Sequence, residues 1–579
     1  MKENKPNANH QNLNNSQRGQ KQNKESKRML LALLVIALVS LFGLGFYFWG
    51  PTLPITYMVE TEDNIELATD VYLPRKPGTY PVLLFRTPYG KSEAFATAQP
   101  YVKLGIGFIS QDHRGCHASG GEYTAFASDG IDALNTVKWM KQQPWFNGKY
   151  ATIGASARGI TQYMQVPYLD DVACQFIQIA TPDVYGQGLF QGGAPRKMLA
   201  ENWLSGIDQD EYYQTIFDHP LSNSTFAADH RIDDYEWNNV TWPSIHRGGW
   251  YDCFNQGILD GYMGYQHKGG KEGAGHAKLI MGPWTHALNS RNAGELTYPE
   301  NAESDPYSND IFEAMFAEKL LDITEFGDYR TFPNVTYYMM GDIDESSNEW
   351  NNWAEASDWP LPYTNKTLYF HENNTLQNVV PTSTSEKSFL YDPADPVDTL
   401  GGANLMSDNR GPFDQRPVEQ NREDIVSFTY EITEPLLITG RIWGHLYITS
   451  NCTDTDFTVK LCDIYPDGRE MLISDGIIRM RHRRGQDKAE LMDGSKSTVY
   501  EAYVDLWSTA YVFNEGHQLK ISVSSSNYPR FAPNLNTGEA IKYYDTDNTY
   551  NIANNSIVLS PTYNSSLILP IPDNSPNFI

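Results

Sequence analysis

The 579-residue sequence is poor in cysteine. Its cysteines show no paired spacing, and the sequence contains neither a CxxC motif nor a Cys/His cluster with metal-ligand spacing. We therefore expect no metal ion and no other cofactor. An odd count leaves at least one thiol free or bonded to another molecule, and a bond between Cys452 and Cys462 stays open. The five cysteines are Cys116, Cys174, Cys253, Cys452 and Cys462.

Basic residues are also scarce over most of the chain. Lysine and arginine total 44 against 71 aspartates and glutamates, so the net charge is −27. Residues 1–28 hold seven basic and two acidic residues, a net charge of +5, and the rest of the chain therefore carries −32. Such an acidic surface repels phosphate groups, so we expect no nucleic-acid partner.

Long apolar runs are limited to one. Residues 29–49 form a 21-residue stretch without a charge, and about 20 residues are enough to span a bilayer as a helix. No lysine or arginine follows it until Arg75. The positive-inside rule then predicts a disordered cytoplasmic tail at 1–28, a transmembrane signal anchor in the lipid bilayer at 29–49, and an extracytoplasmic remainder. A cleaved signal peptide is the alternative interpretation.

A serine in a glycine-flanked turn is the most informative local feature. Ser156 lies in the string Gly154-Ala-Ser-Ala-Arg-Gly159, between a short β-branched run and a helix-compatible stretch at 160–166. This pattern places a serine on a tight strand-to-helix turn, where a side chain at either glycine would collide with the flanking strand or helix. The free N–H groups of the helix start favour a developing negative charge there. An ordinary glycine-flanked turn is the alternative.

An acid and a histidine follow in the order that such a serine requires. In this class of fold the chain order is Ser, then Asp or Glu, then His, with each residue just after a strand. Asp252 follows a strand-like run, and His286 follows the apolar segment 279–281 and a Gly-Pro break. The competing histidines, His246 and His276, precede or begin their strands, which would place them at the wrong end of the sheet.

At these residues the chain resembles a known family, the cocaine-esterase-like and glutaryl-acylase-like serine hydrolases (CocE/NonD type), which are related to X-prolyl dipeptidyl peptidases. The resemblance covers nearly everything after residue 55. Ala157 departs from it, because the family usually has tyrosine there. The motifs that carry it are Gly154-Ala-Ser-Ala-Arg-Gly159, Gly249-Trp-Tyr-Asp252, Gly282-Pro-Trp-Thr-His286, Arg86-Thr-Pro-Tyr89 and the loop Asp112-His-Arg-Gly-Cys-His-Ala-Ser-Gly-Gly-Glu122.

The resemblance implies a role for each of these residues. Ser156 would be the nucleophile, His286 the general base and acid, and Asp252 the group that orients the imidazole. The Tyr89 hydroxyl and the Ala157 N–H would form the oxyanion hole. The residues expected to shape the substrate pocket are Trp250, Phe254 and Trp203. The alternatives are a structural turn residue for Tyr89 and plain core residues for the aromatics.

Changes of pattern along the chain predict its organisation. Residues 55–73 and 80–86 are typical of strands and residues 129–143 of a helix, which favours a parallel sheet covered by helices. From residue 356 onward, short apolar runs broken by turn residues indicate an all-β domain. With the resemblance, this predicts an α/β-hydrolase domain at 51–183 and 241–355, an inserted helical cap at 184–240, and a β jelly-roll domain at 356–579.

Three classes of function remain open at this point. The first is a serine hydrolase that cleaves an acyl ester or amide of a small-molecule or peptide substrate through an acyl-enzyme. The second is an X-Pro dipeptidyl peptidase, although the long N-terminal helical domain of the larger peptidases is absent. The third is a non-catalytic, membrane-anchored binding protein that keeps the fold. The sequence leaves the acyl group and the oligomeric state undetermined.

Overall fold

A large, mostly parallel sheet forms the framework of the N-terminal part of the chain. The computed structural model describes residues 51–271, 273–345, 349–405, 408–540 and 549–579. Eleven strands of these residues form the sheet: β1 (Ile55–Glu60), β2 (Glu66–Tyr72), β3 (Tyr80–Thr87), β4 (Gly107–Asp112), β5 (Phe146–Ala155), β6 (Gln175–Gln178), β9 (Ser244–Gly249), β10 (Ala277–Gly282), β13 (Val335–Met339), β14 (Asn352–Ala356) and β26 (Asn577–Phe578). Their spatial order is β1-β2-β4-β3-β5-β6-β9-β10-β13-β14-β26.

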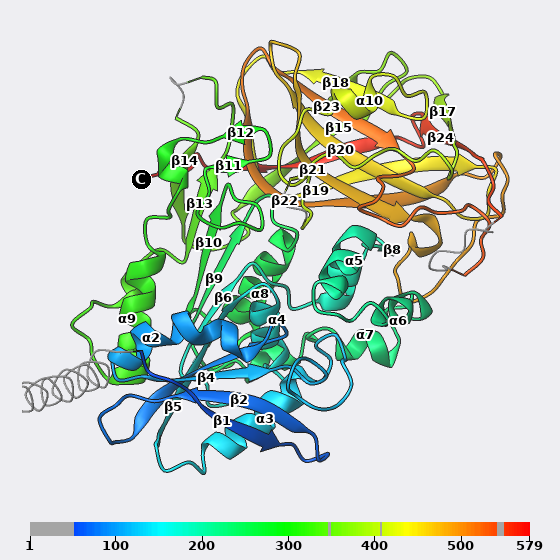
Figure 1. The fold of residues 1–579 in the computed structure, drawn as a ribbon. Helices are drawn as coiled ribbons and strands as arrows, with labels where there is room; N and C mark the ends of the chain where they lie inside the picture. Colours follow the sequence, from blue (N-terminus) through cyan, green and yellow to red (C-terminus); the bar gives the residue numbers. More distant parts are fainter. Residues whose placement is uncertain (1–50, 272, 346–348, 406–407, 541–548) are drawn as a thin grey trace, which may run out of the picture.

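The strand directions define an α/β architecture. From β4 to β13 each strand runs parallel to its neighbours, and the strands at the two ends pair antiparallel. Strands β4, β9 and β10 are buried at every residue, as expected for a parallel sheet covered on both faces. The helices that pack against it are α2 (Phe95–Lys103), α3 (Asp129–Met140), α4 (Ala157–Met164), α8 (Asn255–Lys268) and α9 (Ser308–Leu321) (Figure 1).

Several predicted elements are confirmed, and one is corrected. The strand expected at 80–86 is β3, and the helix expected at 129–143 is α3, which ends at Met140. The single strand expected at 55–73 is wrong, because β1 and β2 form an antiparallel hairpin. The hairpin turns at Asn64, whose φ is 63°. Asparagine tolerates this left-handed conformation better than most residues, so the chain can reverse there.

Residues 184–240 lie between the large sheet and the C-terminal strands (Figure 1). They contain mainly short helices, together with a hairpin of two two-residue strands that the predicted helical cap did not include. The elements of this segment are a π-helical turn (Val184–Leu189), β7 (Phe190–Gln191), β8 (Ala194–Pro195), α5 (Lys197–Ser205), α6 (Tyr212–Asp218) and α7 (Thr225–Asp229). The backbone N–H of Met198 donates to Pro529 O at 3.1 Å, so α5 is tied to the C-terminal part.

The C-terminal part is β-rich, as predicted. A seven-stranded sheet contains β15 (Tyr363–Phe370), β16 (Leu376–Gln377), β17 (Ser385–Tyr391), β19 (Leu436–Ser450), β22 (Tyr500–Phe513), β24 (Ala553–Leu559) and β25 (Ser566–Pro572). A four-stranded sheet contains β18 (Val426–Glu431), β20 (Asp456–Ile464), β21 (Glu470–Arg479) and β23 (Gln518–Ser524). Phe370 stacks on Phe428 with ring centroids 4.5 Å apart, which joins the two sheets. The jelly-roll topology and the exact domain limits stay predictions.

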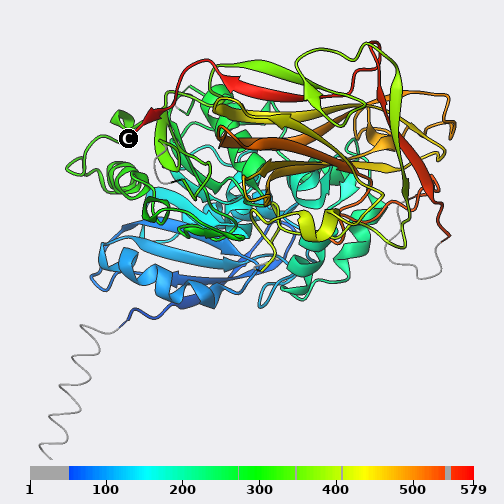
Figure 2. The same ribbon diagram turned by 90° about the horizontal axis from the view of Figure 1, so that it is seen from above.

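The end of the chain returns to the large sheet. After β25 the C-terminal segment, drawn in red, runs back from the β-rich part to the sheet edge (Figure 2). There β26 pairs antiparallel with β14. The two parts of the molecule are therefore joined by hydrogen bonds at an edge as well as by packing.

Two expectations from composition have different outcomes. All five cysteines are free and buried, so Cys452 and Cys462 form no disulfide. Within the described part of the chain, no helix is long and apolar enough to cross a bilayer. The predicted tail at 1–28 and anchor at 29–49 lie outside the described residues.

Candidate active site at the ends of three strands

Three predicted site residues meet at one edge of the large sheet. Ser156 follows β5, Asp252 follows β9 by three residues, and His286 follows β10 by four. These strands are parallel, so their carboxyl ends lie at the same edge, where sites of open α/β sheets form. Asp252 and His286 are 34 residues apart in sequence and Ser156 and His286 are 130 apart, yet Asp252 and Ser156 both lie within hydrogen-bonding distance of His286.

The turn at Ser156 has the predicted strained geometry. Its φ is 60°, in a region that a non-glycine residue rarely adopts. A Cβ on Gly154 would lie 2.5 Å from Arg158 O, and a Cβ on Gly159 would lie 2.8 Å from Gln178 O. The predicted collisions with helix and strand are therefore confirmed. Helix α4 starts directly after Ser156, three residues earlier than expected, and the N–H groups of Gly159 and Ile160 donate to Ser156 O.

A continuous hydrogen-bonded chain links the three side chains. His286 Nε2 lies 2.8 Å from Ser156 Oγ, and His286 Nδ1 lies 2.8 Å from Asp252 Oδ1. A carboxylate only accepts, so Nδ1 carries the proton and Nε2 is free to accept one from the serine hydroxyl. The Phe254 N–H also donates to Asp252 Oδ1 at 3.2 Å, which fixes the carboxylate.

The electrostatic environment stabilises the imidazolium that forms when His286 takes a proton. Burial itself disfavours the imidazolium, but the charge and the hydrogen bond of the Asp252 carboxylate beside Nδ1 favour it. The pKa of His286 is therefore raised above its ordinary value. Asp252 is fully buried, so its charge acts on His286 with little screening by water.

Tyr89 lies beside the serine with its hydroxyl held by a tryptophan. It follows β3, and the Trp203 indole N–H donates to its Oη at 3.2 Å. Burial raises the pKa of Tyr89, while hydrogen bonds from Trp203 and Ser156 act in the opposite direction. The hydroxyl therefore stays protonated and can donate a hydrogen bond to a negative oxygen near Ser156. Trp203 is thus placed next to the site, as predicted, and also contacts Tyr89, which the sequence did not indicate.

An apolar cavity of about 30 Å³ opens onto the serine. Trp203 and Phe254, two of the predicted pocket residues, line it together with Ser156 and Ala157. Trp203 stacks on Phe126 at 5.2 Å, and Phe254 lies edge-on to His286 at 5.8 Å. The remaining lining residues are Ile160, Val184, Gly188, Leu189, Leu199 and Leu405. No local sequence pattern predicts that Phe126 and Leu405 line the cavity, because Phe126 lies in a distant loop and Leu405 in the C-terminal half of the chain.

The expectation for Trp250 is corrected. Its side chain is buried, donates from Nε1 to Tyr338 O at 2.8 Å, and packs on Trp359. It does not line the cavity at Ser156. Asp252 is directed toward the site, whereas Trp250, two residues earlier, points into the core toward Tyr338 of β13 and Trp359.

The competing histidines are placed away from the serine. His246 lies inside β9, fully buried between the Tyr163 hydroxyl and the Ser244 hydroxyl. Burial lowers its pKa to about 3, so it stays neutral. His276 precedes β10, at the opposite end of that strand from His286. His276 therefore lies at the end of the sheet that its sequence position predicted, whereas His246 lies inside its strand and not at the strand's start.

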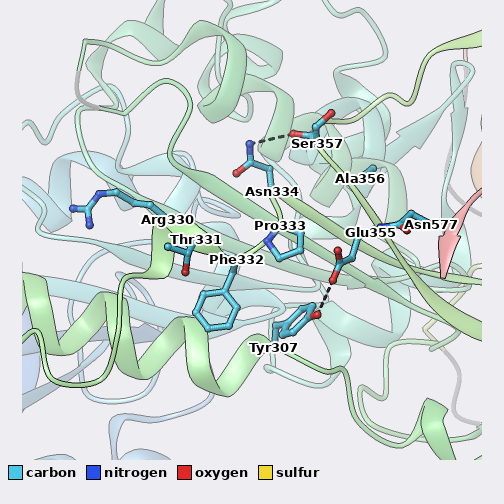
Figure 3. A pocket seen from close by; sticks show the side chains of 10 residues that line it. All are labelled: Tyr307, Arg330, Thr331, Phe332, Pro333, Asn334, Glu355, Ala356, Ser357 and Asn577. Atoms are coloured by element: carbon cyan, nitrogen blue, oxygen red, sulfur yellow. Dashed lines mark hydrogen bonds between the residues drawn. The ribbon is translucent and has the colours of Figure 1, made fainter. Parts of the chain in front are cut away.

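A wider hollow of about 740 Å³ lies elsewhere, at the sheet edge around β14 (Figure 3). Its side chains include Tyr307, whose hydroxyl donates to Glu355 at 2.6 Å, and Asn334, which donates to Ser357 O at 3.1 Å. None of the predicted site residues lines it, and no histidine is among its lining residues. The size of a hollow is therefore a poor guide to the site, and we assign the site by the side chains that meet at Ser156.

The comparisons with known proteins agree with this arrangement. Residues 63–216 match the X-Pro dipeptidyl-peptidase (S15 family), and residues 329–568 match the X-Pro dipeptidyl-peptidase C-terminal non-catalytic domain. The cocaine esterase of Rhodococcus sp. (strain MB1 Bresler) is 30% identical, in an alignment that covers 89% of this chain and 97% of that protein.

Two solved structures share the fold over most of the chain. An aminopeptidase from the marine sediment archaeon Thaumarchaeota archaeon has a TM-score of 0.75 at 20% identity, and an alpha-amino acid ester hydrolase has a TM-score of 0.74 at 21% identity. Each alignment covers 90% of this chain and 97% of the other. The solved structures support the fold, an α/β-hydrolase domain followed by a β-rich C-terminal domain. The similarity to the cocaine esterase and the two family matches establish that the chain is a serine hydrolase of the CocE/NonD family.

Proposed function

We propose that this hydrolase cleaves carboxylic esters through an acyl-enzyme formed on Ser156. The observation that carries the proposal is the hydrogen-bonded chain from Ser156 Oγ through His286 to Asp252, with both links at 2.8 Å. Nucleophile, base and orienting acid are within the reach that proton transfer requires. The same arrangement argues against a non-catalytic binding protein, which would have no need of a strained serine.

The proposed reaction moves one proton back and forth. Ser156 Oγ attacks the substrate carbonyl carbon as His286 Nε2 takes the hydroxyl proton. When the tetrahedral intermediate collapses, Nε2 gives this proton to the leaving alcohol, and the acyl group stays on the serine. Water then attacks the acyl carbon by the same route, which releases the acid and restores Ser156.

Asp252 and the oxyanion hole stabilise the charges that develop during this reaction. Asp252 holds the Nδ1–H tautomer and stabilises the imidazolium that forms in each step. We assign the oxyanion hole to the Ala157 N–H, at the start of α4, and the Tyr89 hydroxyl. This chain has Ala157 where the family usually has tyrosine, and the change of side chain leaves the backbone N–H in place.

The cavity supports esters over X-Pro dipeptides as substrates. A dipeptidyl peptidase must hold a charged N-terminal ammonium, which calls for a carboxylate close to the serine. The residues that line the cavity at Ser156 are apolar apart from Ser156 itself, and none is acidic. We also propose that residues 184–240 act as a cap and limit the acyl group, because Leu199 and Trp203 of α5 form part of the cavity wall.

A substrate panel tests the proposal. Wild-type protein and a Ser156→Ala variant are assayed on p-nitrophenyl acyl esters of increasing chain length and on an Ala-Pro anilide. We expect ester hydrolysis by the wild type, a preference among acyl chains, and activity of the variant at least about 10⁴-fold lower. Faster cleavage of the anilide than of every ester would replace the esterase with the dipeptidyl peptidase.

For the N-terminal part we propose a membrane anchor. The support is the uncharged run at 29–49 behind a tail of net charge +5. Protease added to intact cells should digest the catalytic body. A protected body would reverse the orientation, and a mature N-terminus near residue 51 would indicate a cleaved signal instead.

A further inference from the structure

A buried thiol lies directly beside the histidine of the proposed catalytic centre. Cys253 Sγ is 3.6 Å from His286 Nδ1, on the side of the ring that faces Asp252 rather than Ser156. The donor atoms of Asp252, Cys253 and His286 all lie within 4.8 Å of one another. This thiol takes no part in the proposed hydrolysis reaction.

The carboxylate next to the thiol has an unused oxygen. Asp252 is fully buried, and its Oδ1 accepts from His286 and from the Phe254 N–H. Its Oδ2 has no hydrogen-bond partner among the described residues. A buried carboxylate oxygen without a partner is costly, and a cation next to it would remove that cost.

We propose that Asp252, Cys253 and His286 form a zinc-binding site. Thiolate and imidazole ligands favour Zn²⁺ over Mg²⁺ and Ca²⁺, which prefer oxygen. Bonds of about 2.3 Å to sulfur and 2.0–2.1 Å to nitrogen, at a tetrahedral angle, separate the two ligand atoms by about 3.6 Å. The observed separation of Sγ and Nδ1 is also 3.6 Å. The carboxylate only has to withdraw slightly from Nδ1, and water completes the fourth position.

Binding releases one proton and blocks the base. The thiol proton leaves, the proton of Nδ1 is replaced by one on Nε2, and the lone pairs of Sγ and Nδ1 then bind the metal. A neutral imidazole that binds a metal through Nδ1 must carry its proton on Nε2. Nε2 then cannot accept the proton of Ser156, with which it is in contact in the metal-free arrangement. Zinc therefore inhibits the hydrolase reversibly, and this consequence, unlike the binding itself, rests on the proposed function.

Metal binding is measured first on the Ser156→Ala variant, so that the result does not depend on catalysis. Co²⁺, which replaces Zn²⁺ at such sites, is titrated in, and the sulfur-to-cobalt charge-transfer absorption is followed. We expect one equivalent of Co²⁺ to produce this band and Zn²⁺ to displace it. Adding Cys253→Ala should abolish the band, whereas Cys452→Ala, which removes a buried thiol of the β-rich domain, should leave it unchanged. No band, or a band that persists without Cys253, overturns the site.

Inhibition is measured second, on protein with Ser156 present. Zn²⁺ should inhibit ester hydrolysis, and a chelator should restore it. In Cys253→Ser and Cys253→Ala variants the Zn²⁺ concentration for half inhibition, relative to each variant's own metal-free rate, should rise at least about 10-fold, in the range seen when metal sites lose a supporting group. Equal inhibition of wild type and variants would overturn the regulatory role. A wild-type protein that shows the Co²⁺ band but has no esterase activity would contradict the proposed function and leave the metal site standing.

Discussion

Two of the buried histidine–aspartate groups among the described residues have different arrangements, which suit them to different tasks. At the carboxyl ends of the parallel strands, His286 has the Asp252 carboxylate beside Nδ1 and the Ser156 hydroxyl beside Nε2. At the junction of the two domains, His517 has a carboxylate on each side: Asp463 lies 2.9 Å from Nδ1 and Asp342 lies 3.4 Å from Nε2. His286 can therefore exchange a proton with the Ser156 hydroxyl, whereas both nitrogens of His517 face carboxylates that only accept hydrogen bonds.

The second arrangement fixes a charge. Burial disfavours the His517 imidazolium, but hydrogen bonds to Asp342 and Asp463 outweigh this, and the pKa is raised to about 9. Asp342 belongs to the loop after β13 of the α/β domain, while Asp463 lies on β20 of the β-rich domain. The Tyr511 hydroxyl donates to Asp463 as well, at 2.8 Å. His517 is therefore a permanently charged link between the domains at neutral pH.

The comparison teaches that proximity of His and Asp does not by itself indicate catalysis. What differs is the partner on the second nitrogen and the space beyond it. His286 faces a strained serine and a cavity, whereas His517 is enclosed by charged and aromatic groups. The variants below test this difference, in order of decreasing expected effect on catalysis.

Asp252→Asn should have the largest effect of the four. The amide cannot hold the Nδ1–H tautomer, so we expect kcat to fall by about 10⁴-fold. Loss of the negative charge also lowers the pKa of His286, so the acid limb of the pH profile of kcat/KM should move to lower pH. Steady-state kinetics over a range of pH measures both effects. A variant within tenfold of the wild type would remove Asp252 from the site.

Tyr89→Phe should act mainly in the transition state. Removing one oxyanion-hole donor lowers kcat by about 10²–10³-fold, with little change in KM, because the hydroxyl matters most when the negative charge develops. Parallel determination of kcat and KM on one ester separates these effects. An unchanged kcat would make Tyr89 a structural turn residue.

Trp203→Phe should have a smaller effect through Tyr89. The stacking on Phe126 is retained, and the hydrogen bond to Tyr89 Oη at 3.2 Å is lost. A neutral hydrogen bond contributes about 1 kcal/mol, so we expect kcat to fall about fivefold. In the Tyr89→Phe background the same change should have no further effect on kcat. Additive losses in the double variant would show that Trp203 acts on the substrate directly.

His517→Gln should leave catalysis unchanged and destabilise the fold. Two buried carboxylates lose their common cation, which costs roughly 3–5 kcal/mol in the free energy of unfolding. Because the pKa of His517 is raised in the folded state, its stabilisation is fully present below about pH 6.5 and is lost as the pH rises through about 9.

Urea unfolding at several pH values between about 6.5 and 9 measures this contribution of His517 to the free energy of unfolding. The wild type should lose stability as the pH rises, and the variant should lack this component. The control is the ester hydrolysis rate per folded molecule, which should match the wild type. A large drop in that rate would erase the distinction between the two histidines.

The sequence predicts the sheet-edge site well because the site depends on local signals. The three residues of the hydrogen-bonded chain each follow a strand that has glycine as its last or next-to-last residue, namely Gly154, Gly249 and Gly282. Glycine at such points lets the chain turn where backbones approach closely, so the motif and the geometry share a cause. The chain order of acid and histidine then distinguishes His286 from the other histidines.

The other features of the site could not be predicted, because they depend on where each side chain points and on contacts between distant parts of the chain. Trp250 belongs to the same motif as Asp252 but points into the core. Leu405 reaches the cavity across the domain boundary, and no local pattern announces it. Cys253 and His286 are 33 residues apart, so their contact follows from the fold and not from any metal-binding spacing.

The most direct test of the account is to identify the residue that becomes acylated or phosphonylated. Full-length protein is treated with a fluorophosphonate, digested, and the modified peptide is mapped by mass spectrometry. We predict a single adduct on Ser156, absent from Ser156→Ala and formed far more slowly in Asp252→Asn than in His517→Gln. An adduct on another residue, or equal rates in the last two variants, would contradict the assignment of the sheet-edge group as the catalytic centre.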